Sequence, residues 1–194
     1  MKNALFAVLL IVAALSARAQ DLDKPLLLVA SHDLKGPYHH TALLVVPLHD
    51  RHVGFILNRA TEMTLAKLFP EHAPSTKVAD PVYLGGPEST NAIFAMVARD
   101  PGGAAVHLFE DVFITAQAKA VDRIIEQTPN DARYFAGFVG WQPGELAAEL
   151  DKGWWYAAEP DKGTVFDRQS DGLWETLVER LGKRPPPPEG MRDA

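Results

Sequence analysis

The chain opens with a short apolar run that limits which of its residues can take part in a fold. Lys2 precedes twelve apolar residues over 4–15, and Ala-Arg-Ala at 17–19 puts small side chains where a leader would be cleaved before Gln20. This order of parts is typical of a secretory signal peptide. A helix over the run would rise only about 18 Å, against about 30 Å for a bilayer core. We therefore expect residues 1–19 to be a cleaved leader, and the mature protein to be periplasmic or secreted, without stable insertion in the membrane.

Composition narrows the classes of function that remain. The sequence has no cysteine, which excludes disulfides, thiolate nucleophiles and cysteine-based metal sites. Loss of the leader removes Lys2 and Arg18, so 17 basic residues stand against 25 acidic ones and the formal charge is 17 − 25 = −8. Nucleic-acid binding needs clustered basic residues. We therefore expect no nucleic-acid partner and a fold stabilised by its apolar core alone.

Short apolar runs separated by turn signals predict a strand-rich domain over residues 20–182. These runs resemble buried or half-buried strands in length and in content of branched residues. The predicted strands span residues 25–30, 41–48, 53–57, 82–84, 92–97, 106–109, 112–114, 133–139 and 154–156. The second and third of them are close enough in sequence to form a hairpin.

Four helices are expected among these strands. A threonine-rich stretch at 61–64 is expected to open a short helix that Pro70 stops, and Thr115 is expected to cap a second helix with an apolar stripe starting at Ala118. A third helix should span 144–150, and a fourth 173–181 with Gly182 just beyond its end. Residues 183–194, which include four consecutive prolines, are expected to form a disordered tail.

A sharp corner between a strand and a helix is the strongest local motif. Gly140 and Trp141 end a predicted strand, and Pro143 suits the first turn of the helix that Gly144 begins. Helix N-termini attract anions, so Trp141 and Gly144 could border a ligand pocket. The alternative is a purely structural corner with Trp141 packed inside, which we favour because Glu145 would repel an anion there.

A second glycine motif allows the same two interpretations. Gly85 and Gly86 precede Pro87, which is a turn signal. Two successive backbone N–H groups in such a turn can also form an anion-binding nest. Gly85 and Gly86 are therefore candidate ligand-binding residues, although a simple turn is the preferred interpretation.

Several motifs occur together in the order found in one protein family. They are Gly-Phe-Ile-Leu-Asn-Arg at 54–59, Gly-Gly-Pro at 85–87, Gly-Trp-Gln-Pro-Gly-Glu-Leu-Ala-Ala-Glu at 140–149 with Trp154, and the closing segments 161–166 and 174–182. Over about residues 26–182 the chain resembles the YqgE/AlgH family. The resemblance implies one α+β domain whose mixed, mostly antiparallel sheet is curled, partly barrel-like and flanked by helices. It implies no agreed catalytic residue and no cofactor.

The chain also departs from the pattern of that family. Family members usually lack a leader and carry the label of transcriptional regulator, which export would contradict. The family commonly has Phe-x-Arg-Thr before its second strand, where this chain has Tyr-His-His-Thr at 38–41.

Histidines gather in one part of the sequence and raise the question of a metal site. The five are His32, His39, His40, His49 and His52, and imidazoles are common metal ligands where thiols are absent. A strand between His40 and His49 would hold its ends roughly 25 Å apart. His39 and His40 would face opposite sides if the chain were extended there. We therefore expect no joint metal site, although His32 with one of the pair, or His49 with His52 and Asp50, remain low-ranked candidates.

The sequence favours a binding module over an enzyme. No serine-nucleophile elbow is present, and the carboxylates of Glu145 and Glu149, one helical turn apart, are more typical of a solvated face than of acid–base catalysis. We expect a noncatalytic exported protein that binds another protein or a small molecule. The alternative is an extracytoplasmic hydrolase or metal-dependent enzyme that uses the histidine-rich edge, and a transcriptional regulator ranks third.

Overall fold

The computed structural model describes residues 21–182, so the predicted leader over 1–19 and the predicted tail over 183–194 lie outside the described residues. The described part is one α+β domain. Its strands are β1 (Leu26–Ala30), β2 (Ala42–Leu48), β3 (Arg51–Ile56), β4 (Ala60–Thr64), β5 (Pro81–Leu84), β6 (Glu88–Val97), β7 (Val106–Phe109), β8 (Val112–Thr115), β9 (Ala132–Trp141) and β10 (Trp155–Ala158).

Five α-helices and two 3-10 turns connect these strands. The helices are α1 (Leu65–Leu68), α2 (Ala118–Gln127), α3 (Glu145–Asp151), α4 (Lys162–Phe166) and α5 (Leu173–Gly182), and the 3-10 turns are η1 (Gly36–Tyr38) and η2 (Ala73–Lys77). Within residues 21–182, no helix combines the length and the apolar character needed to cross a bilayer.

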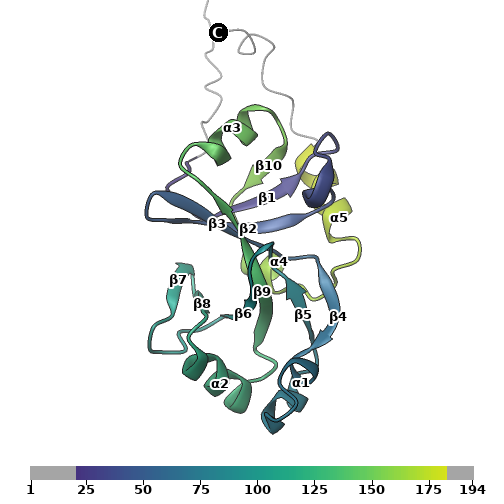
Figure 1. The fold of residues 1–194 in the computed structure, drawn as a ribbon. Helices are drawn as coiled ribbons and strands as arrows, with labels where there is room; N and C mark the ends of the chain where they lie inside the picture. Colours follow the sequence, from purple (N-terminus) through teal and green to yellow (C-terminus); the bar gives the residue numbers. More distant parts are fainter. Residues whose placement is uncertain (1–20, 183–194) are drawn as a thin grey trace, which may run out of the picture.

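The strands form a curled sheet in which β9 is shared by two halves (Figure 1). The strand order is β10-β1-β2-β3-β9-β6-β8-β7, and β5 adds to β9 as the one parallel pair in the described sheet, with β4 beside it. The first half of β9 pairs with β6, and its end pairs with β3. Gly137 lies at this change of partner with φ +72°, a conformation that glycine adopts most readily. The mixed, mostly antiparallel and curled sheet expected from the family resemblance is confirmed.

Burial explains why the first strands are almost wholly apolar. The five residues of β1 are at most 2% exposed, because β1 lies between β2 and β10 and is covered by α5. Strands that are covered on both faces have continuous apolar sequences, as residues 25–30 do. The hairpin expected from 41–57 is present as β2 and β3, which pair from Leu43↔Ile56 to Leu48↔Arg51.

A smaller apolar cluster lies under α2 in the other half of the domain. Val121, Ile124 and Ile125 of this helix are buried there against residues of β6 and β9. The apolar stripe predicted for this helix is therefore present, with one change. Ala120 is buried in place of Ala118, which is exposed.

Three details of the predicted elements are wrong. Residues 61–63 lie in strand β4 and not at a helix start, because Ala60 pairs with Tyr83 and the Thr61 hydroxyl donates to the Val82 carbonyl at 2.6 Å. Only Thr64 opens the predicted short helix, which is present as α1, and its hydroxyl accepts the Lys67 N–H at 3.3 Å. Thr115 ends strand β8 and does not cap α2. Gly182 is the last residue of α5 and not the residue after it.

Candidate functional site

The strand-to-helix corner predicted at 140–150 is the structural basis of the candidate site. Strand β9 ends at Trp141, Gly144 takes φ +84°, and α3 begins at Glu145. The Glu145 carboxylate turns back and accepts the backbone N–H of Gln142 at 2.7 Å. The protein's own carboxylate therefore satisfies a donor at the start of α3, where the anion-pocket interpretation would place a ligand.

Glu149, on the next turn of α3, is the centre of an aromatic cluster. The indole N–H groups of Trp141 and Trp155 both donate to its Oε2 atom at 2.8 Å. The two indole rings meet edge to face, with centroids 6.4 Å apart at 78°. Both rings are buried, whereas Glu149 is half-buried. Two donors on one oxygen fix the orientation of the carboxylate, and no donor of the described residues is bonded to Oε1.

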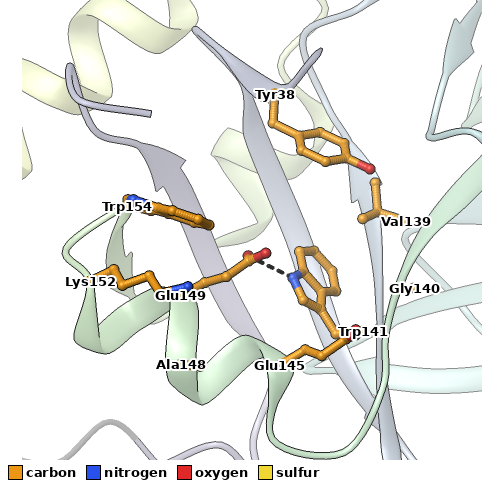
Figure 2. Close-up of a pocket in the computed structure, with 9 residues that line it drawn as sticks. All are labelled: Tyr38, Val139, Gly140, Trp141, Glu145, Ala148, Glu149, Lys152 and Trp154. Atoms are coloured by element: carbon orange, nitrogen blue, oxygen red, sulfur yellow. Dashed lines mark hydrogen bonds between the residues drawn. The ribbon is translucent and has the colours of Figure 1, made fainter. Parts of the chain in front are cut away.

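The carboxylate lies in a pocket of about 300 Å³ between α3, the end of β9 and η1, which we call the Trp141 pocket (Figure 2). Trp154 and Lys152 lie on one side of it, Tyr38 and Trp141 lie on the other, and Glu149 lies between them. The lining residues are Tyr38, Val139, Gly140, Trp141, Glu145, Ala148, Glu149, Lys152 and Trp154.

Lys152 and Tyr38 add an ammonium group and a phenol hydroxyl to the pocket. The Lys152 ammonium lies 4.4 Å from the centroid of the Trp154 ring, within the range of a cation–π contact. Burial raises the pKa of the Tyr38 phenol above its usual range, and the nearby carboxylates of Glu149 and Glu88 raise it further. Tyr38 therefore keeps its proton at neutral pH and can donate or accept a hydrogen bond.

Trp141 can reach its position because the facing strand carries no side chain there. A Cβ on Gly54 of β3 would lie 2.8 Å from Cζ3 of Trp141 and 3.1 Å from Cγ2 of Val45. Real Cβ atoms essentially never approach another atom as closely as 2.8 Å, so Gly54 leaves the space that the indole fills. Gly54, the first residue of the motif at 54–59, thus makes room for one of the residues that line the Trp141 pocket.

The candidate residues Gly85 and Gly86 lie outside the Trp141 pocket. The Gly85 N–H donates to the Ala136 carbonyl at 2.9 Å, so it is engaged within the sheet. A Cβ on Gly86 would overlap the carbonyl group of Phe138. Gly85 and Gly86 follow β5 and lie so close to the backbone of β9 that neither position has room for a side chain. The two glycines do not line the pocket beside Trp141. Gly144 also falls outside the lining set, although Glu145 beside it is included.

The histidines divide into two groups. The rings of His32, His39 and His40 lie around the indole of Trp174 on α5. The ring centroids of His40 and Trp174 are 3.7 Å apart, and those of His39 and His40, which stack, are 3.5 Å apart. The chain is not extended here, since His40 has φ +56°, so the two rings share a side instead of facing apart. Desolvation and the charge of His40 lower the pKa of His39.

The other two candidate histidines belong to the β2–β3 hairpin. His49 occupies its turn with φ +58°, and a ring nitrogen of His52 lies 2.9 Å from the carbonyl oxygen of Leu22. Among residues 21–182, no group of three or more histidine, aspartate or glutamate side chains is placed to hold a metal ion.

Sequence reasoning missed most of the groups that make the pocket. It assigned Glu149 to a solvated face, and it did not select Tyr38, Lys152 or Trp154. The available signal was the spacing of Trp141, Glu149 and Trp155 around a corner that turns the chain back on itself. Tyr38 gave no local signal, because it lies in η1, far from the corner in the sequence.

The chain matches a known protein family over most of its length. The AlgH-like family pattern matches residues 27–186. A UPF0301 protein of Chlorobium limicola is 27% identical over 162 residues, which cover 81% of this chain and 85% of the relative. A UPF0301 protein of Streptomyces coelicolor is 30% identical over 166 residues, with coverage of 79% and 84%.

Solved structures show the same fold. The solution structure of the AlgH protein from Pseudomonas aeruginosa matches with a TM-score of 0.69 at 21% identity, covering 83% of this chain and 89% of that one. A crystal structure of a Corynebacterium diphtheriae protein matches with a TM-score of 0.67 at 20% identity, with coverage of 81% and 86%. On the family pattern and its extent, the chain belongs to the AlgH-like family.

Proposed function

We propose that the protein is an exported, noncatalytic binding module and that the Trp141 pocket is its ligand site. The leader pattern over residues 1–19 supports export. The observation that carries the proposed ligand site is the Glu149 carboxylate, held by two indole N–H groups inside an aromatic pocket of about 300 Å³. Apolar and aromatic walls with a few fixed polar groups are typical of small-molecule sites.

The state of the two pocket carboxylates favours binding over catalysis. Glu145 accepts the Gln142 N–H, and Glu149 accepts two indole N–H groups, so both already hold the fold together. Carboxylate pairs that cleave glycosidic bonds flank the reacting bond from two sides. Here both side chains project from one face of one helix, and the nine lining residues include no serine, threonine or histidine.

Native mass spectrometry tests this role on protein recovered from the envelope fraction of its host. The wild type is expected to retain a bound small molecule as a discrete mass increment. Trp154→Ala removes one wall of the pocket and is expected to lose the increment. Phe69→Ala is the matched control, because Phe69 is an exposed aromatic residue beside α1, at the other end of the domain.

Two results would count against the proposal. One is a wild type that carries no increment. The other is an increment that Trp154→Ala and Phe69→Ala keep equally, since the molecule would then bind away from the pocket.

A further inference from the structure

We infer that the Trp141 pocket recognises a cationic group of a small molecule, and that the Lys152 ammonium occupies the place of that cation in the free protein. This inference rests on the proposed function, because it names the ligand class of the same pocket. Its three supports are the aromatic walls, the excess of carboxylate over basic groups, and the position of Lys152.

Aromatic residues form much of the walls, and the ring of one of them, Trp154, already lies against a cation, the Lys152 ammonium. Tyr38, Trp141 and Trp154 all line the pocket. The face of an aromatic ring carries negative electrostatic potential, and tryptophan binds cations most strongly of the three aromatic residues. Rings gathered around one space are the arrangement by which proteins recognise ammonium groups.

The charges of the pocket also favour a cationic ligand. Its lining holds two carboxylates, Glu145 and Glu149, and one basic group, Lys152, which leaves a formal charge of −1. The Oε1 atom of Glu149 accepts no hydrogen bond from the described residues, while Oε2 accepts two. A carboxylate oxygen in a half-buried position attracts an opposite charge more strongly than it would in water, because the surrounding dielectric is lower.

Lys152 shows that an ammonium group can use this environment. Its Nζ atom lies 4.4 Å from the Trp154 ring centroid, and no carboxylate among residues 21–182 is within ion-pair distance of it. Lysine carries its charge on a flexible four-carbon stem, and the residue is exposed. The ammonium can therefore leave the ring for solvent when a ligand cation takes its place, and Lys152 acts as an internal competitor.

Three probes of the same shape and different charge test the inference. They are choline, its neutral carbon analogue 3,3-dimethyl-1-butanol, and the anion 3,3-dimethylbutanoate, each titrated at constant ionic strength. The indole N–H signals of the four tryptophans report binding by NMR. Trp141, Trp154 and Trp155 belong to the pocket or contact Glu149, whereas the Trp174 indole donates to Ala30 and serves as the internal reference.

The expected result is saturable movement of the Trp154 signal with choline, at a Kd at least tenfold below that of the neutral analogue. Lys152→Ala should tighten choline binding by about two- to fivefold, the range of a single exposed cation–π contact. The control Lys67→Ala, on the distant helix α1, should change nothing.

Glu149→Gln separates charge from structure. The amide oxygen of glutamine can still accept the indole N–H groups, so the pocket keeps its shape while it loses a negative charge. Choline binding should weaken at least tenfold, and binding of the neutral analogue should stay the same.

Three results would overturn the inference. They are equal affinity for choline and its neutral analogue, tighter binding of the anion, or no shift of the pocket indoles with choline. The native mass spectrometry described above does not depend on ligand charge. A pocket-dependent mass increment together with any of these three results would refute the cation while leaving the ligand site standing.

Discussion

Trp141 serves the core and the pocket at once. Its side chain is only 4% exposed, yet it lines the Trp141 pocket and donates to Glu149. From the sequence alone, packing in the core and lining a pocket were alternative roles for Trp141. An indole is large enough for both, because one edge can pack on Gly54 and Val45 while another borders the pocket.

Replacing Trp141 by alanine tests this packing. Trp141→Ala should destabilise the domain by about 3–5 kcal/mol, because a large buried side chain is removed and the site cannot fully collapse. Trp141→Phe keeps one aromatic ring in the core and loses the second ring of the indole together with the hydrogen bond to Glu149, so its effect should be clearly smaller. Thermal melts compare the two, and a near-native melting temperature for Trp141→Ala would show that the indole is not part of the core.

Gly54 gives a complementary test from the facing strand. Gly54→Ala should cost about 1–3 kcal/mol, because the added methyl group overpacks the site against Trp141. Gly182→Ala is the control, since a Cβ there would lie 3.7 Å from the Tyr156 hydroxyl, an ordinary contact. Urea unfolding measures both variants. Equal stability of Gly54→Ala and the wild type would mean that the indole does not pack against β3 as described.

At the scale of elements, β9 is tied to the C-terminal segment through a buried arginine. Arg133 is fully buried and donates to the Val165 carbonyl in α4 at 2.6 Å and to the Leu57 carbonyl at 2.5 Å. Its guanidinium lies 4.1 Å from the Tyr83 ring centroid, and burial lowers its pKa. One side chain therefore connects α4, the end of β3 and the middle of the sheet.

Arg133→Met should destabilise the domain strongly while preserving side-chain volume. It leaves two buried carbonyl groups without a donor, at a cost of about 1–3 kcal/mol for each. The exposed Arg99, whose ion pair with Asp131 spans 3.2 Å, is the control, and Arg99→Met should cost no more than about 1 kcal/mol. Chemical denaturation compares the variants. Similar midpoints for the two would contradict the role assigned to Arg133.

Sequence patterns predicted the elements whose signals are local. The β2–β3 hairpin, helix α2 and the corner before α3 follow from apolar periodicity and turn residues that are close in the chain. Strand β4 could not be predicted this way, because the sequence at 61–64 carries helix-start signals and becomes a strand only by pairing with β5. A pocket beside Trp141 could be suggested from the corner, but Tyr38 and Trp154 could not be assigned to it, since they meet Trp141 only in the folded domain.

At the scale of the whole molecule, the long strand β9 organises both fold and pocket. Its first half belongs to one part of the curled sheet, and its end delivers Trp141 to the other part (Figure 1). The AlgH-like fold is shared with solved relatives at about 20% identity. The leader pattern over 1–19 distinguishes this chain from the pattern expected of the family, so its location is the first property of the whole protein to test.

Export predicts a defined N-terminus. N-terminal sequencing of the protein recovered from the periplasm or the medium should begin at Gln20, because the Ala-Arg-Ala segment at 17–19 suits signal peptidase. A variant with bulky residues at positions 17 and 19 is the control and should stay uncleaved. Recovery of the intact chain with Met1 from the cytosol would refute export.

The most direct test of the proposed ligand site is a crystal structure of the mature protein isolated from its own cell envelope, without added ligands. The predicted result is electron density for a bound small molecule between Trp154 and Trp141, in contact with the Glu149 carboxylate. Density for a ligand elsewhere on the domain, with only water in the Trp141 pocket, would contradict it.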